Sequence, residues 1–151
     1  MLKVDGNQAA PLRREKMSDL DAASAVLCNY LSLTARDLAE IGDFSERFAR
    51  DLLAGRRPFP RDVQNTLNVL FEDLANIRQV MIEQTATEDP TVYIYRDLEQ
   101  SRASPVGKIW PNAYLGPYRT AAFEAFQICC SEGRTLNLRF AESPKVSEPM
   151  S

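Results

Sequence analysis

Arginine is the residue whose spacing in this sequence points most directly to chemistry. Five arginines lie within residues 45–61: Arg47, Arg50, Arg56, Arg57 and Arg61. Two acids, Glu46 and Asp51, oppose them, so this stretch has a local charge of +3 in a chain whose net charge is −3. A guanidinium group binds phosphate oxygens, or the O6 and N7 atoms of guanine, through two parallel hydrogen bonds. The stretch therefore indicates a surface that binds nucleic acid.

The five arginines are not equivalent, because they lie at different places relative to an expected helix. Arg47 and Arg50 are one turn apart and project from the same helical face, which suits base recognition in a major groove. Arg56 and Arg57 follow that helix, where the chain would leave the groove and contact backbone phosphates. The alternative is that each arginine is an ordinary solvated side chain, and this is what we expect for Arg61.

Helical spacing of apolar residues predicts helices over residues 20–31, 35–41, 46–54 and 61–81. Thr34 and Ser45 precede the second and third of these helices, and their hydroxyl groups suit the N-cap position. Gly42 ends the second helix, because glycine tolerates the left-handed conformation that such an end requires. The pattern therefore predicts two short helices joined by a tight turn.

These two short helices have the pattern of a helix-turn-helix, which needs apolar residues facing the core on both helices and an exposed polar face on the second. The residues expected to face the core are Leu38, Ala39, Ile41, Phe44, Ala49, Leu52 and Leu53. The residues left outside on the second helix are Glu46, Arg47, Arg50 and Asp51. Generic packing of four helices would also produce amphipathic helices, so an ordinary bundle is the alternative.

The second half of the chain has a different character. Residues 72–104 carry a net charge of −4, which would repel a phosphate backbone, so we expect this part to point away from DNA. Strands are predicted at residues 91–95 and 135–140, a loop around Trp110 at residues 103–118, and an amphipathic helix at residues 119–133.

The aromatic content of this half exceeds what so small a unit can bury, and a two-stranded sheet is marginal by itself. Pairing with a second copy of the chain would solve both problems. The expected interface contains Tyr93, Tyr95, Trp110, Phe123 and Phe126. The alternative is that all of these residues pack on the long fourth helix within one chain.

The expected fold is mainly α, with an N-terminal helix-turn-helix bundle of four to five helices followed by a small α+β dimerisation region. The expected segments are a flexible tail (1–17), the helix-turn-helix domain (18–83), the dimerisation region (84–140) and a disordered tail (141–151). The first tail holds Arg13, Arg14 and Lys16, so it is either a disordered leader or a basic arm that contacts phosphate.

The segment LTARDLAEIGDFSERFARDLLAG, residues 33–55, resembles the helix-turn-helix of the lambda-repressor-like (XRE) class. The cap, core and stop positions of that class coincide with Thr34, Leu38, Ala39, Phe44, Ser45, Ala49, Leu52 and Gly55. The stretches IGDFS and GRRPFPRDV are similar to a narrower group, the anti-CRISPR-associated repressors and small bacterial proteins of the YdiL type, and the similarity extends over residues 25–140. Leu52 departs from that group, which often has tryptophan there, and Gly42 lies one position earlier than the usual turn glycine.

The resemblance implies a sequence-specific transcriptional regulator that binds double-stranded DNA. Such a protein would be a dimeric repressor, or autorepressor, that binds a pseudo-palindromic inverted repeat through the major groove. The residues implied in DNA binding are Thr34, Ser45, Glu46, Arg47, Arg50, Arg56 and Arg57. The alternative function is a protein-interaction module, such as an antitoxin, that keeps the helix-turn-helix only as a scaffold.

The composition argues against an enzyme. The sequence has no histidine, no glycine-rich phosphate loop and no cysteine pair at metal-ligand spacing, so we expect no catalytic residue, metal, cofactor or small-molecule substrate. The cysteines are Cys28 and the neighbours Cys129 and Cys130, which suit a reducing compartment. The sequence has no run of about 18 apolar residues and no signal peptide, so the expected location is the cytoplasm, without membrane contact.

Overall fold

The structure is a computed structural model that describes residues 22–110 and 114–142. Contacts between Cα atoms divide the chain into two compact units, of which one ends at Val69 and the other begins at Leu70. They are called here the N-terminal unit and the C-terminal unit, and each is described by itself. The division falls inside the helix α5 (Arg61–Glu83), whereas the boundary expected from the sequence follows residue 83.

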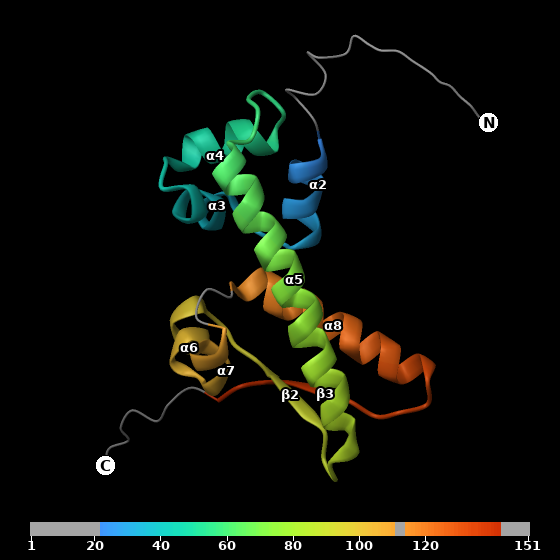
Figure 1. The fold of residues 1–151 in the computed structure, drawn as a ribbon. Helices are drawn as coiled ribbons and strands as arrows, with labels where there is room; N and C mark the ends of the chain where they lie inside the picture. Colours follow the sequence, from blue (N-terminus) through green and yellow to red (C-terminus); the bar gives the residue numbers. More distant parts are fainter. Residues whose placement is uncertain (1–21, 111–113, 143–151) are drawn as a thin grey trace, which may run out of the picture. The chain divides into compact units, whose positions relative to one another are not determined.

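The described part of the N-terminal unit is helical (Figure 1). Its elements are α2 (Ala23–Tyr30), α3 (Ala35–Gly42), α4 (Glu46–Leu53) and the beginning of α5. The core is made by apolar side chains of these helices and their connections: Cys28, Leu31, Leu33, Leu38, Ala39, Ala49, Leu52, Phe59, Val63 and Leu67. Three residues that were expected to face the core, Ile41, Phe44 and Leu53, are only half-buried.

Capping groups define where α3 and α4 begin. Thr34 Oγ1 accepts a hydrogen bond from the Asp37 amide at 3.0 Å, and the Asp37 carboxylate accepts one from the Thr34 amide at 3.0 Å, which makes a reciprocal capping box. Ser45 Oγ accepts a hydrogen bond from the Phe48 amide at 3.0 Å. Both predicted N-caps are therefore confirmed, and only residues 43–45 separate the two helices.

The residue that ends α3 is not the one expected from the sequence. The residue in the left-handed conformation is Asp43, with φ 58° and ψ 51°, and not Gly42, which is the last helical residue. Aspartate tolerates this conformation better than most residues that have a side chain. A Cβ at position 42 would collide with the ring of Phe44. Gly42 therefore leaves the space that the Phe44 ring occupies, while its neighbour makes the turn.

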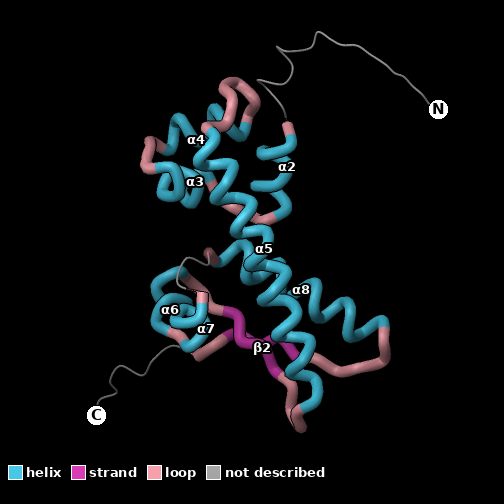
Figure 2. The backbone as a smooth tube through the Cα atoms, in the orientation of Figure 1, coloured by secondary structure: helices cyan, strands magenta, loops and turns pink. Residues whose placement is uncertain are grey.

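The C-terminal unit combines helices with a two-stranded sheet (Figure 2). After the end of α5 its elements are η1 (Gln84–Ala86), β2 (Thr91–Ile94), α6 (Leu98–Ala103), α7 (Pro105–Ile109), α8 (Leu115–Ser131) and β3 (Asn137–Phe140). The strands pair in parallel, with Thr91 opposite Asn137 and Ile94 opposite Phe140. Parallel strands need a long crossover, which α6, α7 and α8 supply here. Helix α8 contacts both strands.

The core of the C-terminal unit mixes aliphatic, aromatic and small residues. Its buried apolar side chains are Leu70, Leu74, Ile77, Met81, Val92, Tyr95, Tyr114, Tyr118, Ala121, Ala122, Ala125, Cys129 and Leu136. The alanines of α8 lie on its buried side, where small side chains allow close approach of neighbouring elements. Tyrosines are concentrated around β2 and the start of α8, and they shape the pocket described below.

The prediction of a loop at residues 103–118 is wrong, because this stretch contains α7 and the start of α8. Ser104 Oγ accepts a hydrogen bond from the Gly107 amide at 3.3 Å, and Pro105 occupies the first turn of α7. A proline is tolerated there because the first amides of a helix have no helical partner. Pro117 similarly lies in the first turn of α8. These prolines begin helices, whereas the sequence pattern suggested that they interrupt the chain.

The described residues are mainly helical and contain a two-stranded parallel sheet, which confirms the expected mainly α class at this level. Both predicted strands are present, although they are shorter than expected, at 91–94 and 137–140. The tail expected at residues 1–17 lies outside the described residues, as does the tail at 141–151 apart from Ala141 and Glu142.

Candidate nucleic-acid interface and an aromatic pocket

Helix α4 has one buried and one exposed face. Ala49 and Leu52 are completely buried, whereas Arg47 and Arg50 are exposed. This separation follows from the helical repeat, which places residues three and four positions apart on the same side. The helix contacts α2 and α3. The two arginines expected to contact bases are therefore presented outward on a helix whose other side is anchored in the core.

Charged side chains on and after α4 pair with acids that are close in the sequence. Arg50 Nη1 lies 3.7 Å from Glu46 Oε1. Arg56 Nη1 donates a hydrogen bond to Asp51 Oδ1 at 3.2 Å, and Arg57 Nε lies 3.7 Å from Asp51 Oδ2. These arginines are 58–67% exposed. The pair with Glu46 is exposed on both sides and contributes about 0–1 kcal/mol, whereas Asp51 is 25% exposed and partly shielded from water.

Arg57 has a second contact that restricts its position. Its guanidinium carbon lies 5.4 Å from the centre of the Phe48 ring, and Phe48 packs edge-on against Phe44 with ring centroids 4.8 Å apart. A cation over an exposed aromatic face gains about 0.5–1 kcal/mol. Arg47, in contrast, has no ion pair within the described part of the chain.

The remaining residues implied in DNA binding have structural roles as well. The hydroxyl oxygens of Thr34 and Ser45 accept the capping hydrogen bonds of α3 and α4, and Glu46 faces Arg50. Arg61 begins α5 and is exposed. All seven implied residues lie in the N-terminal unit, and Asp51, which pairs with both Arg56 and Arg57, is the acid that organises the segment after α4.

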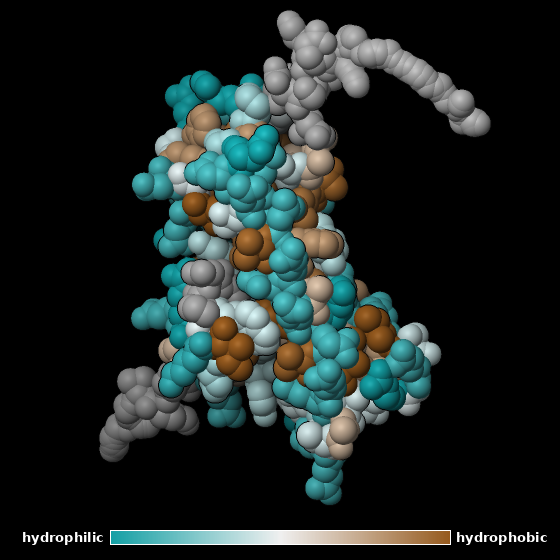
Figure 3. Space-filling model, viewed as in Figure 1, coloured by the Kyte–Doolittle hydropathy of each residue, from teal (hydrophilic) through white to brown (hydrophobic). Residues whose placement is uncertain are grey.

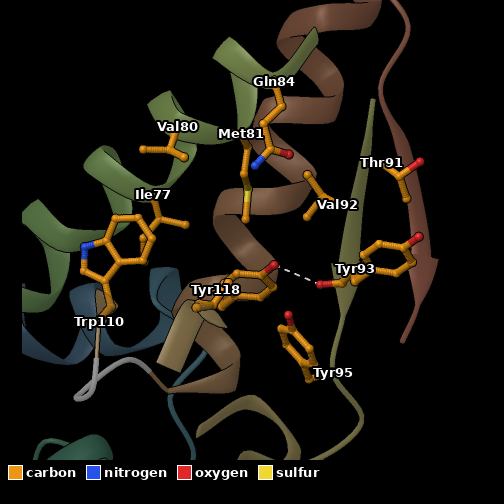
Figure 4. Close-up of a pocket in the computed structure, with 11 residues that line it drawn as sticks. Ile77, Val80, Met81, Gln84, Thr91, Val92, Tyr93, Tyr95, Trp110 and Tyr118 are labelled. Carbon is orange, nitrogen blue, oxygen red and sulfur yellow. Dashed lines mark hydrogen bonds between the residues drawn. The ribbon is translucent and has the colours of Figure 1, made fainter. Parts of the chain in front are cut away.

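The residues expected at a dimer interface fall into two groups in the C-terminal unit. Tyr93, Tyr95 and Trp110 line one pocket (Figure 4). Phe123 and Phe126 lie on α8 with ring centroids 6.5 Å apart. Tyr93 is 50% and Phe123 54% exposed, whereas Tyr95 is only 9% exposed. Tyr95 therefore packs within its own chain, while Tyr93 and Phe123 are accessible.

Tyr118 lies in the middle of this pocket, and the sequence-based site did not include it (Figure 4). Its hydroxyl donates a hydrogen bond to the Tyr93 carbonyl oxygen at 2.8 Å, and its ring centroid lies 5.5 Å from that of Tyr95. Burial, together with the neighbouring Tyr95, raises the pKa of Tyr118 above its ordinary value. The sequence does not indicate this position of Tyr118, because the residue follows Pro117 in a stretch whose composition is typical of a loop.

Large apolar side chains reach the surface in both units. Those more than 40% exposed are Val26, Val69, Phe71, Val80, Tyr93, Ile109, Phe123 and Phe140. On the face shown in Figure 3, hydrophobic residues occur in separate places among hydrophilic ones. Scattered apolar side chains are normal on protein surfaces, so their exposure does not by itself mark a partner site.

Within residues 22–110 and 114–142, no helix is long and apolar enough to cross a membrane. In the same residues, no three His, Cys, Asp or Glu side chains come together where they would hold a metal ion. No model of a known protein family matches the chain, and no curated protein is significantly similar to it.

Proposed function

We propose that the protein is a sequence-specific DNA-binding regulator in which α3 and α4 act as a helix-turn-helix and α4 enters the major groove. The observation that carries the proposal is the division of α4 into two faces. Its apolar face is buried through Ala49 and Leu52, and its outer face presents Arg47 and Arg50. A recognition helix needs this combination, because the core side fixes the orientation in which the other side meets base edges.

The distribution of charge favours α4 over α3 as the recognition helix. Helix α3 carries Arg36 against Asp37 and Glu40, whereas residues 46–57 carry four arginines against two acids. The short connection at residues 43–45 and the capped starts of both helices fit the compact geometry of this motif. A positive α4 segment also suits the phosphate contacts that accompany base recognition.

The arginines divide into two roles in this proposal. Arg47 and Arg50 contact base edges from the helix, and Arg56 and Arg57 contact phosphates beyond its end. Asp51 holds the latter two near the end of α4 through pairs at 3.2 and 3.7 Å, which reduces the freedom they lose on binding. Because the two arginines are 67% and 58% exposed, a phosphate oxygen can reach their guanidinium groups from solvent.

We further propose that the protein acts as a homodimer. A single helix-turn-helix contacts too few base pairs to select a site in a genome, whereas two units multiply the specificity. Two-fold symmetry would then require a pseudo-palindromic operator with half-sites about 34–36 Å apart, or a multiple of this. Tyr93 and Phe123, both about half exposed in the acidic C-terminal unit, are candidates for the contact between copies.

Duplex binding at a series of salt concentrations tests the proposed function. The logarithm of the affinity should fall linearly with the logarithm of the salt concentration, because binding releases counterions from phosphates. Duplexes selected by the full chain from a random pool should then share an inverted repeat. A protein that binds no duplex even at low salt would contradict the proposal and favour the protein-interaction module.

Light scattering of the full chain tests the dimer separately. The expected mass at micromolar concentration is twice the chain mass of 17.0 kDa. A monomer under these conditions, together with selected duplexes that contain only one half-site, would contradict the dimer without affecting the assignment of α4.

A further inference from the structure

We propose that the pocket of the C-terminal unit binds a small, neutral compound with a single aromatic ring, so that the protein has a ligand site besides its arginine surface. This proposal does not depend on DNA binding. It rests on the volume of the pocket, on the chemistry of its walls and on a side-chain amide among its lining residues.

The pocket has the right size for a single ring. Its volume is about 140 Å³, and an apolar cavity of about 150 Å³ is known to hold benzene. Its walls come from the end of α5, from β2, and from Val106, Trp110 and Tyr118. Val80 and Tyr93, which line the pocket, are 41% and 50% exposed, so a ligand has a route from solvent.

The walls favour a neutral aromatic molecule. None of the eleven lining residues is charged, and four of them are aromatic. An ion that entered would lose its hydration without an opposite charge to replace it. A planar ring would instead gain edge and face contacts with the surrounding rings. Figure 4 shows Trp110 beside Ile77 on one side of the pocket and Tyr93 with Thr91 on the other.

Gln84 is one polar group of the lining that can receive a substituent of the ring. The Tyr118 hydroxyl is already engaged with the Tyr93 carbonyl oxygen at 2.8 Å, and the Thr91 hydroxyl lies 3.3 Å from the carbonyl oxygen of Asp89. The side-chain amide of Gln84 has no hydrogen bond within the described residues, and in Figure 4 it lies between Met81 and Val92. A hydroxyl on the ligand would pair with this amide.

A side chain of a second copy is the competing occupant, because Tyr93 and Trp110 are also candidates for a dimer contact. The depth of the pocket favours a small molecule. Its lining includes Ile77, Tyr95 and Tyr118, which are 2%, 9% and 3% exposed. A space whose lining includes residues as buried as these suits a compact molecule better than it suits a contact between two surfaces.

Nuclear magnetic resonance of the full chain provides the test. Trp110 is the single tryptophan of the sequence, so its indole N–H gives one resonance from within the pocket wall. Titration with phenol should shift this resonance saturably, with a Kd on the order of 1 mM for so small a ligand. Benzoate and benzylammonium, which carry a charged substituent on the same ring, should bind at least about tenfold more weakly. Toluene, which lacks the hydroxyl, should bind about fivefold more weakly than phenol.

A pair of matched variants on α5 locates the binding. Val80→Phe places a ring at the exposed edge of the pocket and should weaken phenol binding about tenfold or more. Val69→Phe makes the same change at an exposed valine of α5 that does not line the pocket, and it should leave phenol binding unchanged. Gln84→Leu should abolish the preference for phenol over toluene.

The proposal is overturned if phenol causes no saturable shift, if benzoate binds as well as phenol, or if Val80→Phe binds phenol normally. It is also overturned if the Trp110 resonance moves with protein concentration and not with phenol, because a second copy would then occupy the pocket. If Val80→Phe does not fold, Gln84→Leu provides the test instead. A ratio of phenol to toluene affinity equal to that of the original chain would then overturn the proposal.

Discussion

Several arginines of the two units differ in the kind of partner that they contact. In the N-terminal unit, Arg50, Arg56 and Arg57 are 58–67% exposed and pair with acids at most six positions away in the sequence. In the C-terminal unit, Arg78 donates a hydrogen bond to Glu124 at 2.5 Å across 46 positions, and both side chains are 30% exposed or less. A pair within one or two turns adds little to the tertiary structure, whereas a long-range pair joins separate elements.

Two other arginines of the C-terminal unit, Arg119 and Arg96, also have long-range partners, whereas Arg134 forms its ion pair with Glu132, two positions away. Arg119 donates a hydrogen bond to the Tyr95 carbonyl oxygen at 2.6 Å, across 24 positions. The guanidinium carbon of Arg96 lies 4.6 Å from the centre of the Phe140 ring. These cations are committed to holding their own fold. The lesson is that the partners of an arginine, more than its abundance in a segment, indicate whether it is available to another molecule.

The largest expected effect is on stability, and it distinguishes buried from half-buried positions of α4. Leu52→Ala should lower the free energy of unfolding by about 2–5 kcal/mol, because it removes a completely buried side chain and leaves a cavity. Leu53→Ala, at the half-buried neighbour, should cost clearly less. Urea denaturation of both variants measures the difference. Equal losses would contradict the account of which face of α4 is anchored.

Alkaline pH should lower the free energy of unfolding, because each unit contains one buried side chain that loses a proton at high pH: Cys28 in the N-terminal unit and Tyr118 in the C-terminal unit. Burial raises the pKa of Cys28 from 9.0 to about 11, and burial also raises that of Tyr118. Because the folded state holds these protons more tightly, the stabilisation is complete below the pKa of the unfolded group and is lost as the pH rises through the folded pKa. For the thiol this amounts to about 1–3 kcal/mol between pH 9 and 11.

Urea denaturation at pH 8, 10 and 11 measures this loss. Cys28→Ala and Tyr118→Phe should each flatten the decline of stability with pH, since each removes one titrating group. If both variants keep the slope of the original chain, then neither buried group is the cause of the alkaline sensitivity.

The long-range ion pair gives a smaller effect that should be confined to stability. Arg78→Ala should lower the free energy of unfolding by about 1–2 kcal/mol, since the pair is partly shielded from water. Arg56→Ala, at an arginine that is 67% exposed, should change it by less than about 0.5 kcal/mol. Similar losses of stability in the two variants would remove the distinction between the units.

The smallest expected effect concerns the phosphate contacts. Arg56→Ala and Arg57→Ala should each weaken binding to all duplexes by a similar factor and reduce the salt slope by about 1. Fluorescence anisotropy on a selected and a scrambled duplex measures both quantities. A loss restricted to the selected duplex would assign these arginines to base contacts instead.

The helix starts in the N-terminal unit were predictable because their signals are local. Thr34 and Ser45 are followed by the amides they cap within three positions, so the sequence alone identifies them. The same locality misled the assignment of Gly42, since a glycine at a helix end usually makes the left-handed turn. Only the position of the Phe44 ring shows that the glycine serves packing and that Asp43 makes the turn.

The C-terminal unit was less predictable because its structure depends on distant partners. The parallel pairing of Thr91 with Asn137 has no local signal. The sequence around Pro105 predicts a loop, because proline in the first turn of a short helix has the same local signal as proline in a loop. The place of Tyr118 in the pocket depends on a hydrogen bond across 25 positions. Residue types indicated an aromatic cluster, but not which of its members face one another.

The most direct test of the account is the ratio of affinities for a selected and a scrambled duplex, measured for the original chain, for Arg47→Ala and for Arg139→Ala. Arg139 is an exposed arginine on β3 of the C-terminal unit and serves as the matched control. Arg47→Ala should lower affinity for the selected duplex by about 1–3 kcal/mol and leave affinity for the scrambled one nearly unchanged, so the ratio should fall about 5- to 150-fold. Arg139→Ala should leave the ratio unchanged. An unchanged ratio in Arg47→Ala, or an equal fall in Arg139→Ala, would contradict the assignment of α4 as the recognition helix.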